Sequence, residues 1–126
     1  MQNGFIILVA DRNPRIRNFV ERELRSEGYQ VSTAETVAQL MPWISPGRLP
    51  DLLVLDPDLP GGGAEDYVWP LLARHPRLPV VFHCQAADIP APMPRMACTV
   101  IVEKSADSID LLKRQIALLL KTDPRD

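Results

Sequence analysis

The sequence predicts an α/β fold in which helices cover both faces of a doubly wound, five-stranded and mostly parallel sheet. Apolar runs and amphipathic stretches alternate five times along the 126 residues, and such alternation is typical of parallel sheets with right-handed crossovers. Several of the apolar runs end at a charged residue, as strands do when they deliver side chains into loops. No internal repeat or long linker interrupts the pattern, so we expect one domain over residues 1–126.

The first strand and helix have clear sequence boundaries. Residues 5–10 (FIILVA) form an apolar, β-branched run that ends at Asp11, which is typical of a strand buried on both faces. Asn13 can cap the next helix, Pro14 suits its first turn and Gly28 suits its end. The apolar residues with helical spacing between these points are Ile16, Phe19, Val20 and Leu24.

A short strand over residues 29–32 and a second helical pattern follow. The apolar residues of that pattern are Val37, Leu40, Met41 and Ile44. Pro42 lies among them and should kink or shorten the helix, because proline cannot donate a backbone hydrogen bond. We expect residues 45–50 to form a loop.

The third predicted strand ends at a carboxylate. Residues 52–55 (LLVL) predict a buried strand that ends at Asp56. Pro57, Pro60 and the glycines at 61–63 exclude regular structure after it. A third helix is expected near residues 64–75, with the alternative that it begins at Pro70, which lies inside the pattern.

The last part of the chain predicts two strands and one helix. The strands span residues 78–84 and 99–102, and the helix contains Ile109, Leu112, Ile116 and Leu119 at helical spacing. Between the strands, Gln85 to Met96 carries prolines at positions 90, 92 and 94. Because alternate prolines exclude a normal helix and favour extended chain, we expect a proline-rich loop in place of the fourth helix.

Composition and charge exclude several classes of protein. With 46% hydrophobic and 24% charged residues the chain is typical of a globular domain. A net charge of −2 argues against nucleic-acid binding by this domain alone. No apolar run approaches the ~20 residues of a membrane span, so we expect no membrane partner and a cytoplasmic location. Cys84 and Cys98 lack a paired spacing, and we expect two reduced thiols.

Four chemically useful side chains stand at the ends of predicted strands. They are Asp11, Asp56, Cys84 and Lys104. Ligands of doubly wound sheets bind beyond the carboxyl ends of the strands, where the strand order reverses. We therefore expect these four residues to lie at one edge of the sheet.

Four stretches together resemble the receiver domains of response regulators in two-component signalling. PDLLVLDPDLPGG (residues 50–62) is similar to the third strand with its phosphoacceptor Asp, and VADRNPRIR (9–17) is similar to the acidic pair with the following helix start. LPVVFHCQA (78–86) resembles the fourth strand, and VIVEKS (100–105) the fifth strand with its Lys. The stretches cover nearly the whole chain in the family's order, and the resemblance implies a flavodoxin-like receiver fold.

The resemblance also implies a function. A sensor histidine kinase or phosphotransfer protein would transfer a phosphoryl group to Asp56 in a phosphorelay, with Lys104 and Mg²⁺ neutralising the phosphoryl oxygens. The metal ligands would be Asp11, Asp56 and the backbone carbonyl of Asp58. The output would be binding to a downstream protein target or formation of a homodimer. We therefore expect that the chain is not an enzyme.

Three positions depart from the family pattern. Arg12 stands where the family has a second carboxylate, so Mg²⁺ binding should be weak or lost. Arg12 could either swing outward or pair with Asp56 in place of the metal. Cys84 stands at the usual Thr or Ser position, and its thiol is a weak hydrogen-bond donor. Ile101 replaces the aromatic residue that is typical three positions before the Lys.

The matches and departures together indicate an atypical receiver or pseudo-receiver, in which Asp56 accepts a phosphoryl group weakly or not at all. The alternative is a constitutive pseudo-receiver that acts as an interaction module without phosphorylation. Asp56 and Asp58 also resemble the paired aspartates of haloacid-dehalogenase-type phosphatases, but the later acidic pair of that family is missing. His83 and Cys84 are neighbours on one strand and should face opposite sides, which argues against a shared metal.

Overall fold

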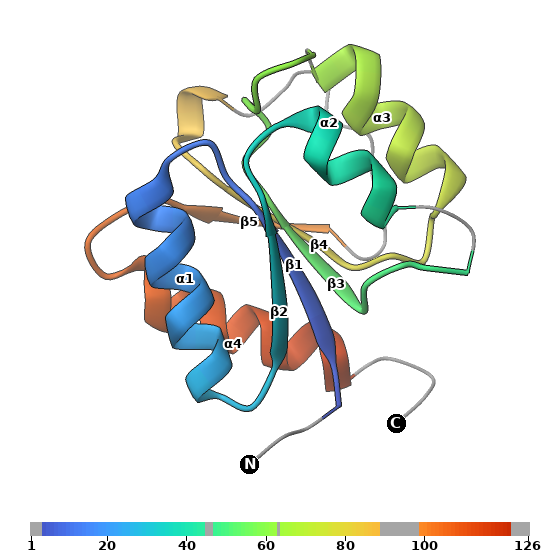
Figure 1. Cartoon of the computed structure of the whole chain (residues 1–126). Helices are drawn as coiled ribbons and strands as arrows, with labels where there is room; N and C mark the ends of the chain where they lie inside the picture. The colour runs from blue at the N-terminus through green and yellow to red at the C-terminus, as the bar shows by residue number, and fades with distance from the viewer. Residues whose placement is uncertain (1–3, 45–46, 63, 89–98, 122–126) are drawn as a thin grey trace.

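A five-stranded parallel sheet with the strand order β2-β1-β3-β4-β5 forms the centre of the molecule (Figure 1). The computed structural model describes residues 4–44, 47–62, 64–88 and 99–121. The strands are β1 (Ile6–Ala10), β2 (Gln30–Ala34), β3 (Leu52–Leu55), β4 (Val80–Cys84) and β5 (Thr99–Glu103). The chain runs outward from β1 to β2 and then returns to the other side of β1 to form β3. The strand order therefore reverses between β1 and β3, and the predicted doubly wound fold is confirmed.

In the described part of the chain, α-helices pack on both faces of the sheet (Figure 1). Helices α1 (Pro14–Ser26) and α4 (Ser108–Lys121) cover one face, and α2 (Val37–Leu40) and α3 (Ala64–Arg74) cover the other. The helix residues buried on the first face are Val20, Leu24, Leu112, Ile116 and Leu120. Those buried on the second face are Leu40, Tyr67, Val68, Leu71 and Leu72. Because both faces are covered, every residue of the central strand β3 is buried, as its unbroken apolar run predicts.

The boundaries of α1 follow the sequence signals. The side chain of Asn13 accepts hydrogen bonds from the backbone N–H groups of Arg15 (2.9 Å) and Ile16 (3.3 Å), and Pro14 occupies the first turn. Gly28 follows the end of the helix with a φ of 95°, a left-handed conformation that glycine adopts without strain. The predicted cap and the predicted end of this helix are confirmed.

Two prolines have different effects on the helices that contain them. Pro42 limits α2 to four residues, and the chain continues as a 3-10 turn over Met41–Trp43, as predicted. The alternative that α3 begins at Pro70 is wrong, because the helix runs from Ala64 through Pro70 to Arg74. Val68, on the turn before this proline, is fully buried, and its packing against the sheet offsets the hydrogen bond that proline cannot donate.

Five of the predicted strand bounds differ in the structure, and two of them are the starts of β1 at Ile6 and of β2 at Gln30, one residue later than predicted. β2 extends to Ala34 because Ala34 pairs with Ala10, the last residue of β1. β5 likewise extends to Glu103, which pairs with Cys84. β4 begins at Val80 instead of residue 78. Sequence patterns record apolar character, whereas strand ends depend on where a neighbour offers hydrogen bonds.

The proline-rich stretch is described only at its start. Residues 86–88 form a 3-10 turn (Ala86–Asp88) after β4. The three alternating prolines and Cys98 lie outside the described residues, so their predicted behaviour stays a prediction. Within the described ranges, none of the helices combines the length and the apolar character that a membrane crossing requires.

Candidate functional site

Two aspartates meet at the carboxyl ends of β1 and β3. Asp11 directly follows β1 and Asp56 directly follows β3, the two strands between which the strand order reverses. The backbone N–H of Asp56 donates to the carbonyl of Ala10 at 2.8 Å, which continues the pairing of these strands by one residue. The topology thus brings together two carboxylates that are 45 positions apart in the sequence.

Asp11 is buried and paired. Its side chain is 3% exposed, Oδ1 accepts from the backbone N–H of Asn13 at 2.9 Å, and Oδ2 lies 3.0 Å from Nζ of Lys104. Burial raises the pKa of Asp11, while the Asn13 amide and the Lys104 ammonium act in the opposite direction. The carboxylate therefore depends on Lys104 for its counter-charge.

Asp56 offers one carboxylate oxygen without a hydrogen bond. Its side chain is 1% exposed, and Oδ1 accepts from the backbone N–H of Asp58 at 3.0 Å. Oδ2 is buried and has no hydrogen-bond partner among the described residues. Two cationic atoms, Nζ of Lys104 and Nε of Arg12, each lie 3.6 Å from this oxygen. Oδ2 is thus a candidate nucleophile that is held between two positive charges.

Arg12 bridges two of the acidic residues. Its guanidinium donates to Oδ2 of Asp58 while Nε faces Asp56, and its side chain is 48% exposed. Of the two arrangements that the sequence left open, this is the one in which Arg12 pairs with Asp56. The guanidinium therefore stands on the solvent side of a buried carboxylate.

The residues at this position fit Mg²⁺ poorly. The carboxylates of Asp11 and Asp56 are suitable hard oxygen ligands, but Arg12 and Lys104 already face them with two positive charges. A dication would have to compete with these two side-chain cations for the oxygens of Asp11 and Asp56. In the described part of the chain, no group of three or more His, Cys, Asp or Glu residues is arranged to hold a metal ion.

Lys104 and Cys84 come from the adjacent ends of β5 and β4. The backbone N–H of Lys104 donates to the carbonyl of Cys84 at 2.9 Å. Burial, followed by the nearby charge of Asp56, raises the pKa of the Cys84 thiol to about 11. In the described part of the chain no hydrogen bond joins this thiol to Asp56, and the Cys84 side chain packs in the core with α2 and α3.

Two further side chains support the loops of the site. The hydroxyl of Tyr67 donates to the carbonyl of Pro57 at 3.1 Å and so ties α3 to the loop after Asp56. Burial raises the pKa of Tyr67 to about 12, so the phenol stays protonated. Arg17 donates to the carbonyl of Asp11 at 2.9 Å. The sequence does not predict this role of Tyr67, because no fixed residue spacing marks a contact between a helix and the loop before it.

Comparison with known proteins identifies one family over most of the chain. The family model described as the response regulator receiver domain matches residues 7–115. This range includes each of the residues described above at the carboxyl ends of the strands.

Similar proteins agree with this match. The DNA-binding transcriptional regulator NtrC of Escherichia coli (strain K12) is 32% identical over 91 residues, which are 72% of this chain and 19% of NtrC. The chain therefore spans about a fifth of the length of that relative. The crystal structure of NtrX from Brucella abortus has a TM-score of 0.78 at 28% identity and covers 94% of this chain and 28% of that one.

A second solved structure covers both chains almost completely. The crystal structure of the histidine kinase ThkA in complex with the response regulator protein TrrA has a TM-score of 0.74 at 27% identity. The match covers 95% of this chain and 99% of that one.

Proposed function

The chain belongs to the response regulator receiver domain family of two-component signalling, and we propose that it is an atypical receiver whose Asp56 accepts a phosphoryl group poorly. The observation that carries this proposal is the position of Arg12, which pairs with both Asp56 and Asp58 on the solvent side of the buried carboxylate. A phosphoryl donor can reach Asp56 only after this guanidinium moves aside.

The proposed chemistry uses the unbonded oxygen of Asp56. Oδ2 attacks the phosphorus of a phosphorylated donor, the bond from phosphorus to the donor breaks, and the donor leaves with that electron pair. Lys104 lies 3.6 Å from Oδ2 and carries a positive charge that can pair with the phosphoryl oxygens. The same lysine must then release part of its interaction with Asp11, which adds to the cost of the modified state.

The proposed partners follow from the family and from one similar structure. TrrA is crystallised in complex with a histidine kinase, and we propose a sensor histidine kinase or a phosphotransfer protein as the donor for this chain. The output would be binding to a downstream protein or to a second copy, without turnover of a metabolite. We propose a cytoplasmic location, which suits a buried free thiol at Cys84.

The charges of the site also favour a second candidate, a constitutive pseudo-receiver. Lys104 holds Asp11 at 3.0 Å, and Arg12 and Lys104 both face Asp56. In such a site the protein's own side chains supply a permanent counter-charge to the carboxylates. In that case the chain would present its binding surface without modification.

Treatment with acetyl phosphate and Mg²⁺, followed by intact-mass measurement, separates the two candidates. The atypical receiver gains one phosphoryl group slowly and incompletely, and Asp56→Asn abolishes the gain. Arg12→Ala should speed the modification because it uncovers Oδ2. As a matched control we suggest Arg114→Ala, which removes an exposed arginine from α4.

The results assign the candidates as follows. No mass gain in wild type or in Arg12→Ala would support the constitutive pseudo-receiver. Rapid and complete modification of the wild type would contradict both candidates, because neither has an accessible Asp56.

A further inference from the structure

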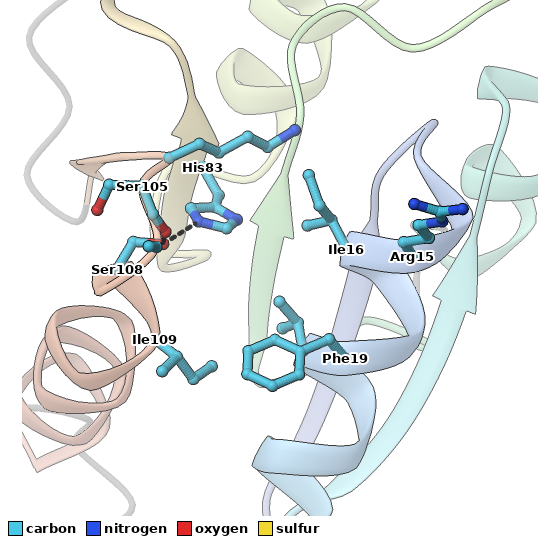
Figure 2. Close-up of a pocket in the computed structure, with 10 residues that line it drawn as sticks. Arg15, Ile16, Phe19, His83, Ser105, Ser108 and Ile109 are labelled. Atoms are coloured by element: carbon cyan, nitrogen blue, oxygen red, sulfur yellow. Dashed lines mark hydrogen bonds between the residues drawn. The ribbon is translucent and has the colours of Figure 1, made fainter.

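A cavity lies on the opposite face of the sheet from Cys84, between α1 and α4 (Figure 2). Its volume is 290 Å³, and its walls are mainly apolar. Ile16, Phe19 and Val20 line it from α1, and Ile109 lines it from α4. Dry apolar cavities of about 150 Å³ accept benzene in other proteins, so this one has room for a larger, bicyclic ring.

His83 places a buried polar group in this apolar cavity. The residue is 4% exposed and stands one position before Cys84 on β4. Figure 2 shows its imidazole extending from β4 into the space between the two helices, with one nitrogen toward Ser108 and the other on the side that faces Ile16. The second nitrogen, Nδ1, is buried and has no hydrogen-bond partner among the described residues.

The contacts of Ser108 determine what this nitrogen can bind. The hydroxyl of Ser108 donates to the carbonyl of Ser105 at 3.0 Å, so its single hydrogen is already used. His83 Nε2 lies 3.1 Å from the same hydroxyl oxygen and therefore donates to it. Because burial lowers the pKa of His83 to about 4, the ring is neutral at pH 7, and Nδ1 carries a free lone pair. An unpaired buried acceptor is costly, and a ligand with a donor would satisfy it.

The charged residues around the cavity restrict the ligand further. The two that line it, Arg15 and Lys104, are both cationic. Lys104 also reaches Asp11 and Asp56 with its ammonium, so its side chain joins the cavity to the candidate functional site. Asp11 and Asp56 compensate the charge of Lys104, so a neutral ligand fits this lining.

We propose that this cavity binds a small aromatic compound that carries a hydroxyl or N–H group, with its ring between α1 and α4 and its donor on Nδ1 of His83. The proposal goes beyond phosphorylation, because the site is complete in the unmodified chain. A failed phosphorylation experiment would leave it unaffected.

The experiment compares 2-naphthol with 2-methoxynaphthalene, which has the same ring system but no donor, by NMR titration of the unmodified chain at pH 7. We expect 2-naphthol to shift the resonances of Phe19, His83 and Ile109. The methyl ether should bind at least about tenfold more weakly, because it leaves Nδ1 unpaired.

Variants test the assigned contacts. His83→Phe keeps a ring in place but removes the acceptor, and it should abolish the preference for 2-naphthol over its methyl ether. Ile109→Trp should fill the cavity and prevent binding, whereas Leu118→Trp, on the exposed side of the same helix, should not. Thermal unfolding checks that each variant folds, and the comparison of compounds on the wild type needs no variant. Equal binding of the two compounds, shifts confined to another surface, or a preserved preference in His83→Phe would each overturn the proposal.

Discussion

At the residue scale, the contacts of Arg12 bear most directly on the chemistry of the candidate site. Arg12 is half-exposed, yet its guanidinium reaches both the buried Asp56 and the exposed Asp58. A long, charged side chain can do this because its stem lies along the surface while its head pairs with a carboxylate. A single side chain thus changes the charge of the site without changing the fold.

Replacing Arg12 with a carboxylate should restore metal binding. Arg12→Asp removes one positive charge, adds an oxygen ligand and leaves Asp11 and Asp56 with Lys104 as their cation. We expect the Mg²⁺ affinity to rise at least tenfold, measured by the shift in unfolding temperature with Mg²⁺ concentration. Arg114→Asp, with the same change of charge on α4, should give no such rise. Tight Mg²⁺ binding by the wild type would contradict this interpretation.

His83 should make the stability of the protein depend on pH. Burial, with a smaller effect of Lys104, lowers its pKa from 6.5 to about 4 in the folded state. Below pH 6.5 the unfolded chain binds a proton that the folded chain does not, so the free energy of unfolding falls as the pH falls from 7 toward 4. From pH 7 to pH 5 the loss is about 2 kcal/mol.

Urea unfolding at these two pH values measures this loss. His83→Phe should lose correspondingly less stability than the wild type, since it has no ring to protonate. His75→Gln removes the other histidine and serves as the matched control, which should behave as the wild type does. An identical pH dependence in wild type and His83→Phe would contradict the assigned burial of a neutral ring.

At the scale of elements, α3 shows how burial can preserve a helix that contains a proline. Its apolar residues lie on the side that packs against the sheet, whereas Pro70 is exposed. The proline ring removes one intrahelical hydrogen bond, which costs about 3 kcal/mol. The burial of several apolar side chains of α3 stabilises the helix by about 1.5–3 kcal/mol each. The helix persists because the burial of its apolar face against the sheet outweighs the cost of the lost hydrogen bond.

Pro70→Ala should stabilise the protein. The new N–H can donate to the carbonyl of Asp66 one turn earlier, and an exposed alanine loses no packing. A more flexible unfolded chain offsets part of the gain, so we expect the free energy of unfolding to rise by about 1–2 kcal/mol. Pro14→Ala is the matched control. It should give no gain, because the N–H of the first helical residue has no acceptor within the helix. Equal effects of the two substitutions on the free energy of unfolding would show that Pro70 does not destabilise the helix.

At the scale of the whole molecule, the sheet separates two apolar cores. Ile44 and Phe82 belong to the core with α2 and α3, and Ile116 belongs to the core with α1 and α4. Neither core is complete without the sheet, so both should be lost in the same unfolding transition. The candidate site lies at the end of the sheet, where residues that follow β1, β3 and β5 meet.

Substitutions in the two cores should have additive effects on stability. Ile44→Val and Ile116→Val should each lower the free energy of unfolding by about 0.5–1.5 kcal/mol. Because the side chains lie on opposite faces of the sheet, the double variant should equal the sum within about 0.5 kcal/mol. Urea unfolding followed by both fluorescence and circular dichroism provides the measurement. Two separate transitions, or a larger deviation from the sum, would show that the cores do not behave as described.

The sequence by itself determined the fold class, the order of the elements and the family. Strand interiors and helix faces are local patterns of apolar residues, and Asn13, Pro14 and Gly28 are local signals, so all of these can be predicted without a structure. The placing of Asp11 and Asp56 at one edge follows from the alternation of strands and helices. The presence of Arg12 at an acidic position of the family pattern was equally visible.

Only the tertiary structure decided the direction and the contacts of the side chains. The ends of β2 and β5 depend on hydrogen bonds from neighbouring strands, and the start of α3 depends on packing that overrides Pro70. Whether Arg12 swings outward or pairs with Asp56 depends on the position of Asp58 across the loop. The sequence showed His83 as a polar residue that faces away from Cys84 on an apolar strand, but it did not show the contact with Ser108. The cavity beside it exists because α1 and α4, 82 residues apart at their closest ends in sequence, pack side by side on one face of the sheet.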